Sequence, residues 1–146
     1  MYEIEIDKRR QDVAVFSEPC AALAGAIEGG AEAGALAELV GSHVANLKKR
    51  IGRDPDRAIL GCTHYEMVAG LFRSALAPGT PLIHQPASTA EALRRYVARH
   101  PEYDIGASGL QRFLTTGPAG RRNALAEGFW GGRIDFESVA VAPLVA

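Results

Sequence analysis

The sequence has 146 residues, of which 47% are hydrophobic and 23% are charged, and its formal net charge at pH 7 is −1. This composition is typical of a globular protein with a sizeable core, and the near-neutral charge gives no reason to expect nucleic acid or an anionic membrane as a partner. No segment is apolar over the ~18 residues that a transmembrane helix needs, and the charged first residues lack the apolar core of a signal peptide.

Short apolar runs alternate with longer helical segments in the first third of the chain. Residues 1–11 are polar and charged and resemble part of a surface helix. The apolar run Val13–Phe16 predicts a buried strand. Helices that stop at glycine are expected over 21–28 and 32–51.

The alternation continues to the end of the sequence. The remaining predicted elements are a strand at 58–60, a helix at 65–76, a strand at 81–83, a helix at 88–100 with Ser88 or Thr89 as its N-cap, an extended stretch from 103, a strand at 112–116, a helix at 119–129 and a last strand at 139–141. This order favours an α/β fold with a parallel sheet, whose functional sites lie beyond the C-terminal ends of strands. The segment Gly61–His64 follows such an end.

Cys62 and His64 are the first candidates for chemistry. Cys62 stands between a predicted strand and a predicted helix, and a thiol at a helix N-terminus ionises more readily than a free thiol. His64 can act as an acid or a base near neutral pH. Thr63 can offer a hydroxyl or N–H group to a substrate carboxylate, and Gly61 allows a tight turn or a close approach of a ligand.

Residue types alone leave other interpretations open. A packed cysteine is the ordinary alternative for Cys62, and Cys62 with His64 supplies two ligands, too few for zinc, so we expect no metal. With Cys20 as the only other cysteine, no disulfide framework is implied, and a reducing cytoplasm is the default compartment. The basic residues at 48–50 and 121–122 are expected to be solvated. These residues are compatible with a reactive thiol, but they do not identify the reaction that it would carry out.

Three motifs that occur in a fixed order narrow the choice of protein family. They are Val13-Ala14-Val15-Phe16-Ser17-Glu18-Pro19-Cys20 with Leu23 and Ile27-Glu28-Gly29-Gly30, then Ile59-Leu60-Gly61-Cys62-Thr63-His64-Tyr65, then Phe113-Leu114-Thr115-Thr116-Gly117 with Ala126 and Phe129-Trp130-Gly131. The second is similar to the second cysteine motif of glutamate racemase, in the aspartate/glutamate racemase superfamily. The other two resemble the Ala-Cys-Pro…Ile-Glu-x-Gly stretch and the C-terminal Thr-Gly strand and helix of that family.

The resemblance implies an incomplete three-layer α/β racemase-like fold with a parallel sheet, in which one domain is partly present together with the C-terminal part of the other. Residues 1–62 are expected to form most of the C-terminal part of the second domain. Residues 63–146 are expected to be the return segment that completes the first. The family's N-terminal half, with its first catalytic cysteine, is absent from this sequence. Cys20 matches a different family cysteine and is expected to be packed.

The resemblance also implies a reaction, the interconversion of L- and D-glutamate without a cofactor, by proton transfer to and from cysteine. Cys62 is then one proton carrier, His64 assists it, Glu28 orients the histidine or the substrate ammonium, and Thr63 binds the substrate carboxylate. The expected partner is glutamate, with neither nucleic acid nor membrane, and a homo-oligomer stays open. The implied role is to supply D-glutamate for peptidoglycan, and so for cell-wall biogenesis and cell shape, in the bacterial cytoplasm.

Some residues depart from the family pattern. Glu66 replaces the usual proline, and His84-Gln85-Pro86 stands where the family usually has an aspartate. Because one proton carrier leaves the opposite face of the substrate without an acid, we expect this chain alone to be weakly active or inactive. Three alternatives remain: a one-cysteine decarboxylase of malonate-like acids from the same superfamily, a non-catalytic binding or dimerisation module, and an unrelated α/β binding domain.

Overall fold

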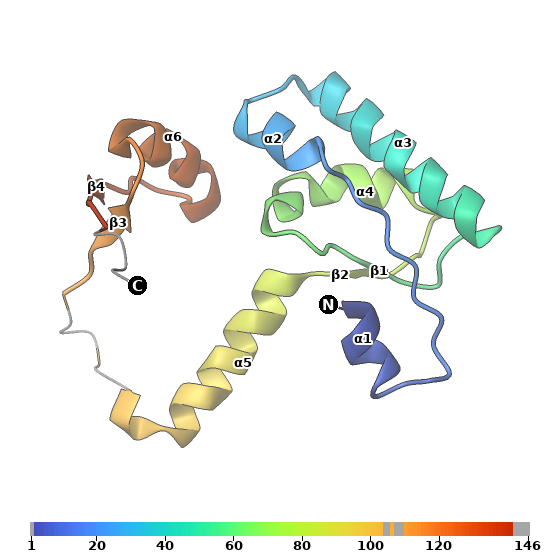
Figure 1. Cartoon of the computed structure of the whole chain (residues 1–146), viewed down its shortest axis with the longest axis horizontal. Helices are drawn as coiled ribbons and strands as arrows, with labels where there is room; N and C mark the ends of the chain where they lie inside the picture. Colours follow the sequence, from blue (N-terminus) through green and yellow to red (C-terminus); the bar gives the residue numbers. More distant parts are fainter. Residues whose placement is uncertain (1, 104–105, 107–109, 142–146) are drawn as a thin grey trace, which may run out of the picture. The chain divides into compact units, whose positions relative to one another are not determined.

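The computed structural model describes residues 2–103, 106 and 110–141 (Figure 1). The chain divides into two compact units, Met1–Leu93 and Arg94–Ala146. The helix α5 (Gln85–Arg99) begins in the first unit and ends in the second. Among the described helices, none combines the length and the apolar character that crossing a bilayer requires.

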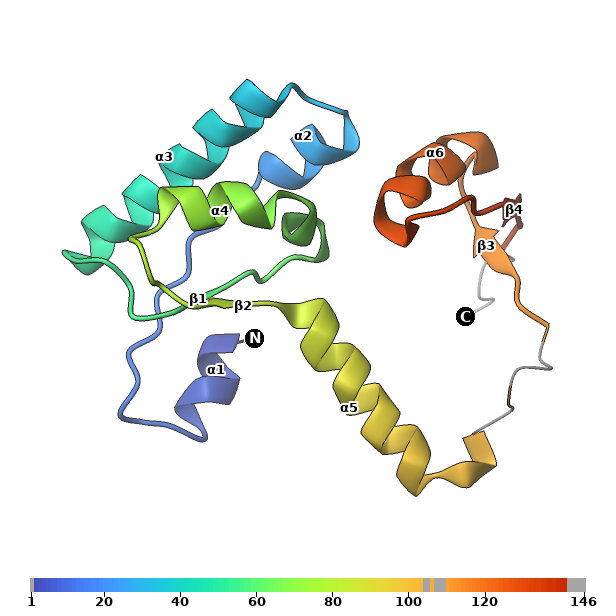
Figure 2. The ribbon, with the colours of Figure 1, turned by 180° about the vertical axis from the view of Figure 1, so that it is seen from behind.

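The first unit contains a parallel pair of short strands and a group of helices. Its elements are α1 (Tyr2–Asp7), α2 (Leu23–Glu28), α3 (Ala33–Ile51), β1 (Ala58–Ile59), the 3₁₀ helix η1 (Thr63–Val68), α4 (Ala69–Ala75) and β2 (Leu82–Ile83). The helices α2, α3 and α4 lie side by side in both views of the ribbon (Figure 2), and η1 contacts both α2 and α4. This group of helices positions the end of β1.

The core of the first unit is apolar and joins these helices to β1. Leu23 of α2 and Val40 of α3 are fully buried, and Leu60, directly after β1, is buried in the same core as Phe72 of α4. Cys20 belongs to this core too, in agreement with the expectation that it is packed. Burial of these side chains is the main force that holds α2 and η1 together.

The second unit contains a second parallel pair. Its elements are the 3₁₀ helix η2 (Pro101–Tyr103), β3 (Phe113–Thr115), α6 (Ala119–Trp130) and β4 (Phe136–Ser138). Phe113 pairs in register with Phe136 and packs its ring against Trp130, with ring centroids 5.6 Å apart. The Asn123 side-chain oxygen accepts a hydrogen bond from the main-chain N–H of Phe136, so α6 is tied directly to β4.

The predicted α/β class with parallel strands is confirmed, and most elements lie close to their expected places. The predicted strand Val13–Phe16 is wrong. A strand needs a neighbour to bond laterally, whereas Val13 N–H bonds back to the carbonyl of Arg10 and both Val13 and Phe16 are exposed. Apolar composition alone could not reveal this, because it does not say whether a neighbouring strand is present.

Four other elements differ from the predictions. The helix expected over 65–76 starts two residues earlier and is a 3₁₀ helix over its first part. The helix α5 starts at Gln85, so Ser88 is not an N-cap: its hydroxyl donates to the carbonyl of His84 one turn back. The last strand lies at Phe136–Ser138 instead of 139–141. Tyr103 is in η2 rather than extended, and residues 104–105 lie outside the described residues.

The division of a longer protein into two domains at residue 62 stays a prediction. The two units seen here are groups of residues within this chain alone.

Candidate active site

The candidate site lies where β1 ends and η1 begins. Leu60 is buried, Gly61 is exposed, and Cys62 takes an extended conformation (φ −128°, ψ 140°) as the residue that precedes η1. The carbonyl of Cys62 accepts a hydrogen bond from the main-chain N–H of Tyr65 at 3.1 Å, which closes the first turn. The Gln85 side-chain amide donates to the carbonyl of Leu60, so α5 also fixes this end of β1.

Three of the predicted site residues come together here. The sulfur of Cys62 lies 3.6 Å from Nδ1 of His64, and Nε2 of His64 lies 2.8 Å from a carboxylate oxygen of Glu28. The two histidine contacts use opposite sides of the same ring. Glu28 is the last residue of α2 and stands 36 positions before His64 in the sequence, so this contact is made by the fold.

The ring contacts fix how protons are arranged in this group. A carboxylate only accepts hydrogen bonds, so Nε2 of His64 carries a proton and donates it to Glu28. In the neutral ring Nδ1 then holds a lone pair facing the Cys62 thiol, and it can accept the thiol proton. Glu28 stabilises the imidazolium that forms. The group can thus produce a thiolate beside a charged histidine.

The group is accessible to a small molecule. The side chains of His64 and Glu28 are 25% and 35% exposed, and Cys62 is half-buried. Thr63, the fourth predicted site residue, is exposed and directly follows Cys62 in the sequence. Gly61 does not adopt a positive φ, and a Cβ there would meet only the ring of Tyr2 at an ordinary 3.8 Å. A tight turn was one of the two reasons expected for glycine at position 61, but this turn does not require glycine.

Comparison with known proteins gives this geometry a context. The glutamate racemase of Caulobacter sp. (strain K31) is 67% identical over 138 residues, which are 94% of this chain and 49% of that protein. The glutamate racemase of Phenylobacterium zucineum (strain HLK1) is 66% identical over 137 residues, which are 94% of this chain and 48% of that protein. This chain is related to the glutamate racemases.

The relationship confirms the resemblance found in the sequence, and the chain spans about half the length of the curated glutamate racemases that it matches. No protein-family model matches the chain.

Solved glutamate racemases share the fold. The RacE1 isoform of Bacillus anthracis matches with a TM-score of 0.85 and 27% identity, over 97% of this chain and 52% of that one. The Francisella tularensis enzyme, solved with D-glutamate, matches with a TM-score of 0.76 and 21% identity, over 95% of this chain and 52% of that one. The chain therefore has the α/β fold of about half a glutamate racemase, as predicted.

Sequence reasoning missed the residues that support the site. Tyr65 donates its hydroxyl to the carbonyl of Cys20 at 3.0 Å. Burial, followed by the nearby thiols of Cys20 and Cys62, raises the pKa of Tyr65 to about 12. Burial also raises the pKa of the Cys20 thiol, so this cysteine stays protonated. The presence of a tyrosine directly after His64 was visible in the sequence, but its partner is a main-chain atom that leaves no sequence signal.

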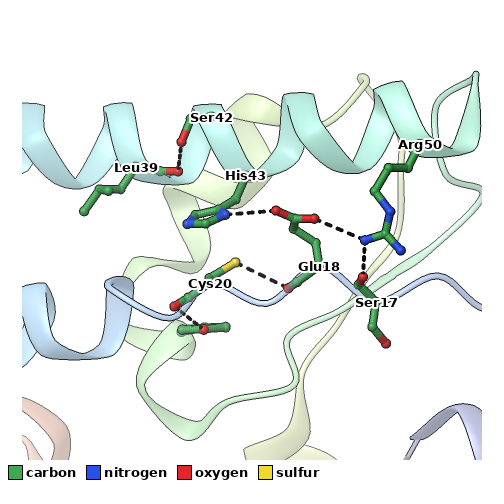
Figure 3. A network of polar contacts seen from close by, with 8 residues as sticks. Ser17, Glu18, Cys20, Leu39, Ser42, His43 and Arg50 are labelled. Carbon is green, nitrogen blue, oxygen red and sulfur yellow. Dashed lines mark hydrogen bonds and ion pairs between the residues drawn. The ribbon is translucent and has the colours of Figure 1, made fainter.

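A network centred on Glu18 anchors the segment that leads into α2 (Figure 3). One oxygen of the Glu18 carboxylate lies 3.1 Å from Nδ1 of His43, and the other accepts from Arg50 at 3.3 Å, both on α3. Arg50 also donates to the carbonyl of Ser17 at 2.6 Å. The basic cluster at 48–50 was expected to be solvated. Arg50 is 52% exposed, in agreement with that expectation, and it also binds this segment.

A second network joins the residues that depart from the family pattern. Nδ1 of His84, directly after β2, lies 2.8 Å and 3.0 Å from the two carboxylate oxygens of Glu66 in η1. The guanidinium of Arg73 lies 3.4 Å from Nε2 of the same ring. These contacts hold η1 against the end of the strand pair.

Proposed function

We propose that this chain supplies one half of a glutamate racemase active site, in which Cys62 exchanges a proton with the α-carbon of glutamate. The arrangement Cys62–His64–Glu28 carries this proposal, because it gives a thiol a base within reach and gives that base a fixed partner. The similarity to glutamate racemases over 94% of the chain supports glutamate as the substrate and racemisation as the reaction.

The chemistry follows from the contacts of His64. Nδ1 takes the proton of the Cys62 thiol, and the resulting thiolate takes the α-proton of glutamate, forming a new S–H bond as the C–H bond breaks. The electron pair stays on the α-carbon and the adjacent carboxyl group. Racemisation is complete when a second acid returns a proton to the opposite face. We assign that acid to the first cysteine of the family's N-terminal half, and the reaction needs no cofactor.

Thr63 and Glu28 have supporting roles in this proposal. Thr63 is exposed and directly follows Cys62 in the sequence, and we assign to its hydroxyl the binding of the substrate carboxylate, which would hold the α-carbon near the thiol. Glu28 keeps His64 in the tautomer that accepts from sulfur. The product, D-glutamate, is then available for peptidoglycan in the cytoplasm.

A chimera tests the proposal in a whole enzyme. This chain replaces the matching half of the Caulobacter racemase, which is 67% identical. In that chimera Cys62→Ala is expected to lower racemisation by at least about 10²-fold, the contribution of one positioned acid or base. Proton NMR in D₂O should also show that exchange of the α-proton falls much more for one enantiomer of glutamate than for the other, because Cys62 serves one face.

Cys20→Ala is the matched control. It removes the other thiol, which is buried and faces the carbonyl of Glu18 at 3.6 Å instead of the site. We expect racemisation to change by no more than a few-fold. Equal losses in the two variants would contradict a special role for Cys62. Release of CO₂ from a malonate-like acid, without α-proton exchange of glutamate, would favour the decarboxylase instead.

A further inference from the structure

The carbonyl oxygen of Cys20 joins two elements that carry different site residues. The main-chain N–H of Leu23, the first residue of α2, donates to it at 3.1 Å, and the hydroxyl of Tyr65 in η1 donates to it at 3.0 Å. A carbonyl oxygen has two lone pairs, so both of its acceptor positions are in use. One main-chain atom therefore links the start of α2 to η1.

The contact between Glu28 and His64 spans the same two elements. Glu28 ends α2, and His64 is the residue before Tyr65. The buried side chains of Leu23 and Ile27 hold α2 in the core, but apolar packing is not directional and fixes the orientation of so short a helix weakly. A hydrogen bond has a preferred distance and angle, so the Tyr65 hydroxyl adds the missing constraint.

We propose that Tyr65 is a positioning residue, whose hydroxyl holds Glu28 against His64 by way of the Cys20 carbonyl. The ring of Tyr65 packs against Phe72 of α4 with centroids 5.6 Å apart, so the hydroxyl is itself held in place. It stays protonated, and able to donate, well above neutral pH. This inference rests on the proposed function, which gives the contact between Glu28 and His64 its purpose.

The segment that carries Cys20 is fixed from its other side as well. Glu18 is bound to His43 and Arg50 of α3, two residues before Cys20 (Figure 3). The carbonyl of Cys20 is thus a fixed point rather than a loose loop atom. Because this acceptor is fixed, the hydrogen bond from the Tyr65 hydroxyl fixes η1 relative to α2, as the proposal requires.

The test uses the 146-residue chain and does not depend on catalysis. Proton–nitrogen NMR follows the Nε2–H of His64, which the contact with Glu28 protects from exchange with water; the signal is assigned by its loss in His64→Gln. We expect Tyr65→Phe to make this proton exchange about tenfold faster while circular dichroism shows an intact fold. Glu28→Ala should remove the protection. Tyr96→Phe, the same change at an exposed tyrosine of α5, should leave it unchanged.

Two results would overturn the proposal. One is a folded Tyr65→Phe chain in which Nε2–H exchanges as slowly as in the original chain. The other is an unfolded Tyr65→Phe chain, which would assign the hydroxyl to general stability rather than to positioning. An inactive chimera would refute the proposed function alone, because the exchange measurement reads the contact between His64 and Glu28 and not the reaction.

Discussion

At the scale of single residues, the site combines features that the sequence shows and features that it hides. Cys62, Thr63 and His64 are adjacent, and a cysteine beside a histidine at a strand end is a recognisable pattern. Glu28 was named only through resemblance, because a glutamate before two glycines is by itself ordinary. The hydroxyl of Tyr65 and the carboxylate of Glu18 were missed, because their partners are brought to them only by folding.

The ionisation of Glu18 leads to a prediction of how the stability of the chain depends on pH. The hydrogen bond from His43, with a smaller contribution from Arg50, holds the pKa of the Glu18 carboxyl below its usual value of 4.5. A lowered pKa in the folded state means that Glu18 stabilises the chain above about pH 4.5 and that this contribution is lost as the pH falls. We expect Glu18→Gln to lower the urea midpoint near neutral pH and to match the original chain in acid.

Glu38→Gln is the control for Glu18→Gln. Glu38 is an exposed carboxylate on α3, so its replacement removes the same charge without touching the network. Its urea midpoint should stay close to that of the original chain at every pH. A constant difference between Glu18→Gln and the original chain, in acid as well as near neutral pH, would show that the effect is not one of ionisation.

At the scale of elements, those whose formation depends only on their own segment of sequence were predicted well. The helix α3 was expected over 32–51 and lies at Ala33–Ile51, because its apolar spacing and its terminal glycine are both properties of the segment itself. Strands were predicted less well, since each needs a partner from another part of the chain. The apolar run Val13–Phe16 shows this, and so does the last strand, which lies three residues before its predicted place.

Two glycines, one inside α3 and one at its end, should respond to alanine in opposite directions. Gly52 has φ +78° and its N–H bonds to the carbonyl of Lys48, so Gly52→Ala should cost about 1 kcal/mol of unfolding free energy. Gly41 lies inside the helix, and a Cβ added there would meet open space, so Gly41→Ala should add about 0.5–1 kcal/mol. Urea unfolding measures both, and the same sign for both would contradict the helix end placed here.

At the scale of the whole molecule, each unit leaves apolar strand residues open to solvent. Ile59 and Ile83, paired on β1 and β2, are 38% and 37% exposed, and in the second unit Leu114 on β3 is 48% exposed. Strands of parallel sheets are ordinarily covered on both faces. The chain also spans about half the length of its curated relatives. Composition indicated a globular core, but it could not indicate that strand residues would stay uncovered.

The isolated chain should be a poor racemase. Under the proposed mechanism Cys62 acts here without the second acid, whose loss alone costs about 10²–10⁴ in rate. We expect turnover of L- or D-glutamate below ~1 s⁻¹, the low end of ordinary enzyme rates, as followed by circular dichroism. Cys62→Ala provides the background. A chain that turns over glutamate faster than this, with activity that depends on Cys62, would show that a second acid lies within these residues.

Mutations at the two ends of the hydrogen bond between Tyr65 and the Cys20 carbonyl should have unequal effects. Its acceptor is a peptide oxygen, which every amino acid possesses, so position 20 can change to any residue small enough for its buried space without removing the acceptor. The donor is a phenol, which no other residue type supplies with the same reach. Mutation of Tyr65 therefore removes the donor, whereas small replacements at position 20 keep the acceptor, so the two ends of this hydrogen bond differ in their tolerance of substitution.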